Sequence, residues 1–361
     1  MPRLSTVSWL VSSIALFGLS SFLVGCEPKK APPKARSKAS SSRVPARSKT
    51  AKAPVTRKTN VAQAGTVKAL KPRKPAAPKV LTKEQRCAKG EGQACYELAA
   101  ENHMGSQGKP NVKQAVAYYK KACKFGVGSA CHNLGVMYQS GRGLPQDFKK
   151  AQSYYEQACN NKSGAGCYNL GHLYAKGFGP KQDMTKAFAL FRKGCTYAEA
   201  SSCNDKGLFL ETGRGTKKSV PHAVFAFSRA CRLGDGKGCF NLARLHKKGK
   251  GLPKDPKRIN ELMTKACNRH IGLACYHMGN FFSRDKNNPS NYLKARMYYS
   301  KACQLRIGEG CNNLAVIYHM GYGVAKSDAM AFRYYTLACR LGFKAGCQNR
   351  KYLRTQPNRP Y

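Results

Sequence analysis

Negative charge is scarce in this chain of 361 residues. Aspartate and glutamate together number 17, against 64 lysines and arginines, and the formal net charge is +47. Few acidic partners are available to neutralise so many cations, so the excess must lie on the surface or in a tail. The hydrophobic fraction is nevertheless 42%. The composition therefore leaves enough apolar material for a folded core beside the charged surface.

Strand patterns and the usual hydrolase motifs are also missing. From residue 87 onward the chain has no strand-like alternation of apolar and polar residues, which argues against a sheet. No His-Glu-x-x-His motif occurs, and the eight histidines stand at unlike positions; this excludes the common zinc-hydrolase arrangement. We therefore predict no catalytic residue, no metal site and no cofactor.

Cysteine, by contrast, is abundant, with 17 residues. In an oxidising compartment such cysteines form disulfides, so the chain should carry an export signal. Residues 1–25 have the layout of a signal peptide, with Arg3 before an apolar stretch. The stretch ends Leu-Val-Gly-Cys26, which resembles a bacterial lipobox in which Cys26 is lipidated. The alternative is an uncleaved transmembrane anchor, and both place the remainder outside the cytoplasm. Glu27 is not the aspartate of inner-membrane retention, which favours the outer membrane.

Residues 26–80 read as a disordered basic tether. They consist mainly of Lys, Arg, Ala, Pro and Ser, and such a segment cannot bury enough apolar area to offset its ordering entropy. Outside the cytoplasm, we expect this charge to meet anionic phospholipid, lipopolysaccharide phosphates or acidic wall polymer rather than nucleic acid. The plainer alternative is a solvated spacer.

The cysteines after the tether keep a strict period of 36 residues. The first of each pair is Cys87, Cys123, Cys159, Cys195, Cys231, Cys267, Cys303 or Cys339. The second follows eight residues later, at Cys95, Cys131, Cys167, Cys203, Cys239, Cys275, Cys311 and Cys347. A period in the thirties without strand alternation predicts a helix-turn-helix repeat.

Each unit predicts two helices. Apolar or small residues recur three, four and seven positions after the second cysteine, as in Leu134, Gly135 and Tyr138, which is one face of a helix. A Gly-x-Gly then ends the helix in most units. The second helix should start at a capping residue sixteen positions past the second cysteine, namely Asn111, Asp147, Asp183, Ser219, Asp255, Asn291 or Ser327. The prediction is an all-α, right-handed α/α solenoid of seven hairpins over 81–355, with a C-terminal tail at 356–361.

The pattern Leu134-Gly135-x-x-Tyr138-x-x-Gly-x-Gly, followed by Asp147 and Tyr154-Tyr155, resembles the Sel-like repeat, a relative of the tetratricopeptide repeat. With cysteines eight apart in every unit, the chain is most similar to the Helicobacter cysteine-rich protein family, here in a lipoprotein form. That family is associated with penicillin binding and weak β-lactamase activity, so the resemblance implies a possible hydrolase. The unit from 275 to 303 departs from the pattern because it lacks the Gly-x-Gly.

Two cysteine pairings are open in stacked hairpins. Pairing each second cysteine with the next first cysteine leaves Cys87 and Cys347 without partners. Pairing the two cysteines that are eight residues apart uses all sixteen cysteines. We therefore predict Cys-x7-Cys disulfides that join the second helix of one hairpin to the first helix of the next, each contributing about 2 to 3 kcal/mol. Zinc is the rival reading, but seven intervening residues do not match the spacing of structural zinc sites.

A ladder of amides is the predicted binding feature. Asn133, Asn169, Asn241 and Asn313 each stand two residues after a second cysteine. In tetratricopeptide-type folds the first helices line the concave groove, where the amides could hold a peptide or a peptidoglycan fragment. The alternative is that they bond to the adjacent structure or face water. If they bind a ligand, alanine replacements should weaken binding without lowering the melting temperature.

A hydrolase would need other residues. Ser106-x-x-Lys109 and Ser283-x-x-Lys286 match the serine β-lactamase nucleophile pattern, but no Ser-Asp-Asn or Lys-Thr-Gly supplies the rest of that site. We therefore favour a lipid-anchored envelope scaffold that binds protein or peptidoglycan, with a β-lactamase-like hydrolase as the alternative.

Overall fold

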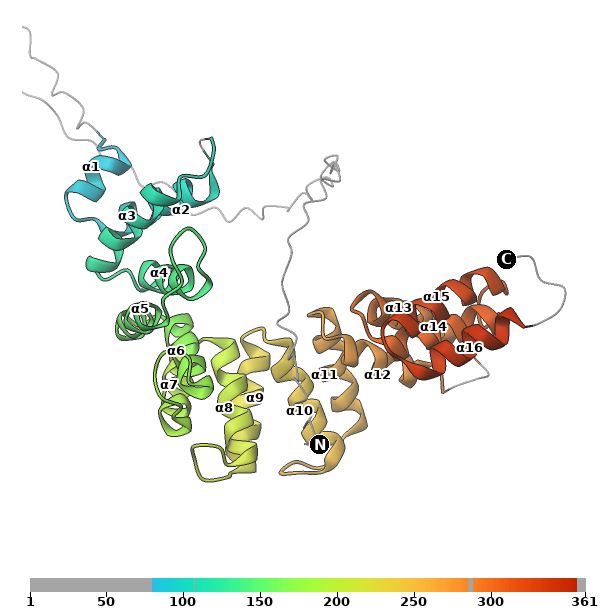
Figure 1. The fold of residues 1–361 in the computed structure, drawn as a ribbon. Coiled ribbons are helices and arrows are strands. Elements are labelled where there is room, and N and C mark those ends of the chain that lie inside the picture. Colours follow the sequence, from blue (N-terminus) through green and yellow to red (C-terminus); the bar gives the residue numbers. More distant parts are fainter. Residues whose placement is uncertain (1–79, 107, 285–287, 356–361) are drawn as a thin grey trace, which may run out of the picture. The chain divides into compact units, whose positions relative to one another are not determined.

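The computed structural model describes residues 80–106, 108–284 and 288–355, and the secondary structure in these ranges is helical (Figure 1). Within them, no helix is both long and apolar enough to cross a membrane. The predicted signal peptide, Cys26, nearly all of the tether 26–80 and the tail 356–361 lie outside the described residues. The helices are α1 (Lys83–Ala88), α2 (Gly92–Met104), α3 (Val112–Lys124), α4 (Gly128–Ser140), α5 (Phe148–Asn160), α6 (Gly164–Lys176), α7 (Met184–Thr196), α8 (Ala200–Thr212), α9 (Val220–Arg232), α10 (Gly236–Lys248), α11 (Pro256–Asn268), α12 (Gly272–Phe282), α13 (Pro289–Gln304), α14 (Gly308–Met320), α15 (Asp328–Arg340) and α16 (Lys344–Arg354).

These helices confirm the predicted repeat. Seven hairpins run from α2–α3 to α14–α15, and the short α1 and the terminal α16 are the partial helices at the two ends. In each hairpin the even-numbered helix comes first and the odd-numbered helix packs against it. The predicted caps hold for most second helices: Asp147, for example, accepts a hydrogen bond from the Lys150 backbone N–H at 2.9 Å. Ser219 stands at the cap position of α9, but its hydroxyl bonds to His222 instead.

The sixth hairpin corrects one predicted boundary. Asn291 was predicted to cap its second helix, whereas α13 begins three residues earlier at Pro289 and its cap is Asn288. The Asn288 side chain accepts from the Ser290 backbone N–H at 3.0 Å. Proline favours the first helical position, because its fixed φ suits a helix and its missing N–H is not needed there. The proline therefore overrides the repeat register in this unit.

The core repeats with the sequence. Three residues after the second cysteine a leucine such as Leu134 is fully buried, and the next position is glycine in several units. A Cβ on Gly135 would come within 2.5 Å of the Tyr155 ring of the paired helix, so this contact requires a glycine. At the turn end of the hairpin, Tyr138 stacks on Tyr154 with 5.5 Å between ring centroids. Six of the seven hairpins bury an aromatic ring at the position of Tyr155, and the α10–α11 hairpin has Met263 there.

Eight disulfides connect consecutive repeats. Each links a cysteine near the end of an odd-numbered helix to one in the next even-numbered helix, as predicted. The pairs are Cys87–Cys95, Cys123–Cys131, Cys159–Cys167, Cys195–Cys203, Cys231–Cys239, Cys267–Cys275, Cys303–Cys311 and Cys339–Cys347. All sixteen of these cysteines belong to the described part of the chain. So many disulfides are typical of proteins outside the reducing cytoplasm.

The two layers of helices differ in how closely repeats approach. Most even-numbered helices of neighbouring repeats contact each other directly, namely α4 with α6, α6 with α8, α8 with α10, α12 with α14 and α14 with α16, whereas α2 with α4 and α10 with α12 approach less closely. Odd-numbered helices of neighbouring repeats have no comparable contact within the described residues. The first helices therefore form the closely spaced layer. Their shared outer surface is the first-helix face, which we define by the positions two, five and nine residues after the second cysteine.

Candidate ligand-binding face

The four predicted asparagines lie at one repeat position on the first-helix face. They belong to α4, α6, α10 and α14, and each is half-buried. The structure therefore places equivalent amides on four of the first helices. Glu97, Asp205, His277 and Asn349 occupy the same position on α2, α8, α12 and α16.

Three of these amides bond to the preceding repeat. Asn241 donates through Nδ2 to the Asn204 carbonyl oxygen Oδ1 at 2.8 Å. Asn313 donates to Oδ1 of Asn280 at 3.2 Å. The Nδ2 of Asn169 lies 2.9 Å from Nε2 of His132. The ladder is thus a set of hydrogen bonds between neighbouring first helices.

The ladder also contacts the tyrosines of the second helices. Asn133 hydrogen-bonds to Tyr119, which partly offsets the burial that raises the pKa of this phenol. Asn169 does the same for Tyr155, whose pKa is raised strongly by burial. These partners mean that alanine at Asn169 or Asn241 should lower stability by about 1 kcal/mol, since a half-buried hydrogen bond is lost. The expectation of an unchanged melting temperature is therefore revised for these two residues.

Two pockets open on the first-helix face. The pocket between α6 and α8 has a volume of about 420 Å³. Inside it, Nε2 of His172 lies 2.9 Å from a carboxylate oxygen of Asp205, across the repeat boundary. The Arg214 guanidinium lies over the Phe209 ring, 5.3 Å from its centroid. This pocket thus contains an acidic residue, Asp205, together with the cations Lys176 and Arg214.

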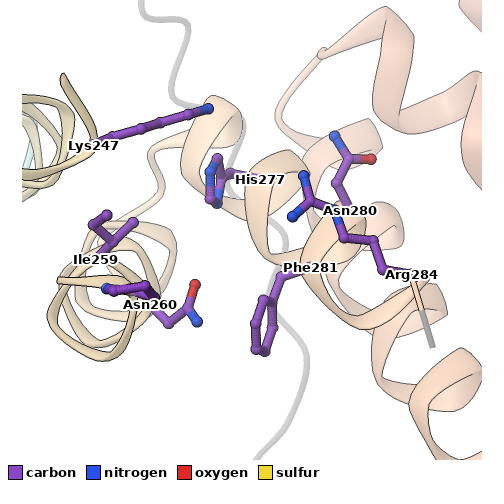
Figure 2. A pocket seen from close by; sticks show the side chains of 8 residues that line it. Lys247, Ile259, Asn260, His277, Asn280, Phe281 and Arg284 are labelled. Atoms are coloured by element: carbon purple, nitrogen blue, oxygen red, sulfur yellow. The ribbon is translucent and has the colours of Figure 1, made fainter. Parts of the chain in front are cut away.

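The second pocket lies between the α10–α11 hairpin and α12 and has a volume of about 270 Å³. Figure 2 shows the Lys247 and Arg284 side chains reaching toward His277 from two sides. Ile259, which is 8% exposed, and Phe281, which is 42% exposed, supply apolar walls. Pro256, Asn260 and Asn280 complete the lining.

No acid lines this second pocket, and neither cation has an ion pair among the described residues. Burial, followed by the Lys247 and Arg284 cations, lowers the pKa of His277. The imidazole Nδ1 is buried and has no hydrogen-bond partner among the described residues. The positive charge in the second pocket is thus not neutralised by any described residue.

The two pockets use the same repeat positions. Asp205 and His277 both stand two residues after the second cysteine, Phe209 and Phe281 six residues after it, and Thr212 and Arg284 nine residues after it. Sequence analysis recognised only the first of these positions, as part of the amide register. The available signal for the second pocket was Phe281, which is 42% exposed at a position where Met137, Leu173 and Leu245 of other repeats are buried in the core.

The two Ser-x-x-Lys motifs lie at helix ends. The Ser106 hydroxyl donates to the carbonyl oxygen of Glu101 at 3.3 Å. Ser283, at the end of α12, contacts the carbonyl oxygen of Asn280 and the Tyr299 hydroxyl at 3.3 and 3.0 Å. Lys286 lies outside the described residues. The structure thus places both serines in turns that close hairpins.

Fold and disulfides together define a solenoid of helical hairpins with covalent links between repeats. The Sel1 repeat profile matches this chain seven times, at residues 92–125, 128–163, 164–196, 200–235, 236–270, 272–306 and 308–343. The chain belongs to the Sel1 repeat family.

Solved structures agree with this fold. The chain is 22% identical to c5321, a protective antigen of uropathogenic Escherichia coli strains, with a TM-score of 0.67 over 76% of this chain and 59% of that one. It therefore spans a little over half the length of that antigen. A Sel1 repeat protein of Oxalobacter formigenes is 22% identical, with a TM-score of 0.62 over 75% of this chain and 78% of that one. Cysteine-rich protein B of Helicobacter pylori is 32% identical over 35% of this chain and 91% of its own length, with a TM-score of 0.31. Among curated protein sequences, the comparison found no match.

Proposed function

We propose that this chain is a lipid-anchored scaffold of the bacterial envelope that binds an extended protein segment or a peptidoglycan fragment along its first-helix face. Cys26 carries the lipid, the basic tether spans from the membrane to the solenoid, and the outer membrane is the favoured location. The tether's cations contact anionic lipid or lipopolysaccharide. The observation that carries the proposal is the set of half-buried amides at one repeat position of α4, α6, α10 and α14.

The ladder supports binding because its hydrogen bonds use only part of each amide. A carboxamide has two N–H donors and an oxygen that accepts twice. Asn241 uses one N–H toward Asn204, which fixes the orientation of the amide and leaves its oxygen to accept from a ligand. Groups that are held in place before binding lose little entropy on binding. Polar side chains recur at this position every 36 residues, as amides at Asn133, Asn169, Asn241 and Asn313, and suit the regularly spaced polar groups of an extended chain.

The proposal is tested by a pull-down of the purified solenoid from envelope extract, followed by mass spectrometry of proteins and muropeptides. Asn169→Ala should weaken recovery of the ligand about threefold to tenfold, since one or two hydrogen bonds are lost. Asp147→Ala is the matched control, because it removes a helix cap of about 1 kcal/mol away from the ladder. Equal recovery by both variants, at equal melting temperatures, would contradict binding at the ladder.

Two parts of the proposal have separate tests. Labelling with an alkyne fatty acid should mark the chain, and Cys26→Ala should abolish the label; a label that survives would remove the anchor from the proposal.

The hydrolase alternative predicts turnover of a chromogenic cephalosporin that Ser283→Ala or Ser106→Ala abolishes. We expect no such turnover.

A further inference from the structure

The pocket between α10 and α12 has the chemistry of an anion site with an apolar wall. Lys247 and Arg284 both lower the pKa of His277 through their charge, so the two cations lie close to the same imidazole. Figure 2 shows the two side chains converging there. Neither is neutralised by a described residue, and like charges held together favour an anionic ligand. An arginine with free N–H groups can bind a carboxylate through two parallel hydrogen bonds.

The apolar wall decides which anion fits best. Ile259 and Phe281 line the same pocket as the cations, and a bare phosphate or sulfate would leave this apolar surface unused. A terminal amino acid carries a carboxylate and an apolar side chain on one carbon atom. An internal aspartate or glutamate does not, because its carboxylate ends a separate methylene chain. The volume of about 270 Å³ is below the roughly 300 to 1,000 Å³ of sites for drug-sized ligands, and suits an end residue rather than a length of chain.

We infer that this pocket binds the terminal carboxylate of a peptide whose last residue has an apolar side chain. The guanidinium of Arg284 and the amine of Lys247 hold the carboxylate, while Phe281 and Ile259 contact the side chain. Asn260 and Asn280, which also line the pocket, supply amides near the last peptide bond. The inference rests on the proposed function, because it names the end of the ligand that the first-helix face would hold.

The same chemistry has two sources, a protein C-terminus and the stem peptide of peptidoglycan. They differ in the configuration of the last residue, which is L in the first and D in the second. Binding of fluorescein-labelled pentapeptides to the full chain, with its disulfides formed, can be followed by fluorescence anisotropy. The probes end in L-Leu, L-Ala or D-Ala, each as the free acid and as the C-terminal amide.

We expect the free acid to bind about tenfold more tightly than its amide, since one charge-assisted contact is lost. Arg284→Gln and Lys247→Gln should each abolish this preference. The matched control is Lys248→Gln, which removes the same charge from the next residue of α10, outside the pocket, and should keep the preference. Tighter binding of the L-Leu acid would assign the pocket to protein termini, and tighter binding of the D-Ala acid to stem peptides.

Equal binding of acid and amide, or no binding of either, would overturn the carboxylate site. So would an equal loss of affinity in Lys248→Gln. These results leave the proposed function standing if Asn169→Ala still loses the envelope ligand in the pull-down. Conversely, an intact acid preference with no effect at Asn169 would keep the pocket and remove the ladder.

Discussion

The pocket between α6 and α8 and the pocket between α10 and α12 occupy the same repeat positions but differ in charge. In the first, Asp205 pairs with His172 across the repeat boundary at 2.9 Å. In the second, His277 replaces the aspartate, and Lys247 and Arg284 approach it with no acid among the described lining residues. Three changes at equivalent repeat positions, from Asp205 to His277, from Thr212 to Arg284 and from Ala175 to Lys247, therefore distinguish an internally neutralised pocket from a cationic one. A solenoid can thus vary its ligand sites one repeat at a time while its core stays unchanged.

The largest expected effect tests whether the disulfides beside the two pockets stabilise the solenoid equally. The Cys195–Cys203 disulfide joins α7 to α8 beside the first pocket, and Cys267–Cys275 joins α11 to α12 beside the second. Replacing either pair with alanine should lower the free energy of unfolding by about 2.5 kcal/mol, because a short loop is no longer closed in the unfolded chain. Calorimetry of the two double variants measures this. If the two losses of unfolding free energy differ by more than about 2 kcal/mol, the helices around the two pockets are not equivalent in structure.

A smaller effect comes from exchanging the charges. His277→Asp places a carboxylate between Lys247 and Arg284 and should weaken binding of a free-acid peptide about tenfold. In an Arg284→Gln background, Asp205→Asn should open the first pocket to the same peptide, since Arg214 then has no carboxylate beside it. Anisotropy titrations measure both. If His277→Asp leaves the affinity unchanged, charge does not distinguish the pockets.

The smallest effect is a pH dependence of stability. Burial lowers the pKa of both His132 and His277, so the folded state prefers the neutral imidazole. The unfolded chain takes up a proton near its ordinary pKa of about 6.5. Stability should therefore be complete above that pH and fall as the pH drops toward the lowered folded pKa values.

Melting curves at about pH 7.5 and about pH 5 measure this loss. His277→Gln should make the loss smaller, and His132→Gln should do the same for the first half of the solenoid. A melting temperature that rises on acidification would contradict the sign of both shifts.

Much of the fold could be predicted because its signals are local or periodic. The cysteine period and the Asp147 type of cap depend on residues close together in the chain, and each appears where it was expected. The boundary at Asn291 failed because Pro289 acts on the helix start more strongly than the repeat register does. The cap is therefore the residue directly before the proline, and the 36-residue period alone does not predict this position.

The candidate site was less predictable. The Asn ladder was recognised as a register, but its partners lie 33 or 37 residues away, as in Asn313 with Asn280 and Asn241 with Asn204. That offset depends on the rotation between neighbouring hairpins, which no single repeat encodes. The pockets required the same information, since Lys247 and Arg284 line one pocket only when consecutive hairpins are packed together. Cys26 and its lipid stay a prediction, because they lie outside the described residues.

The disulfides cross repeat boundaries rather than closing hairpins, and this matters for a chain pulled from its ends. Each bridge joins residues eight positions apart, so a stretched chain bypasses the segment between the two sulfurs. A residue adds at most about 3.5 Å to an extended chain. Under load the hairpins can open one by one, but every boundary turn stays closed. In the proposed scaffold, which links the membrane to a bound ligand, the disulfides would therefore limit how far the solenoid can be extended.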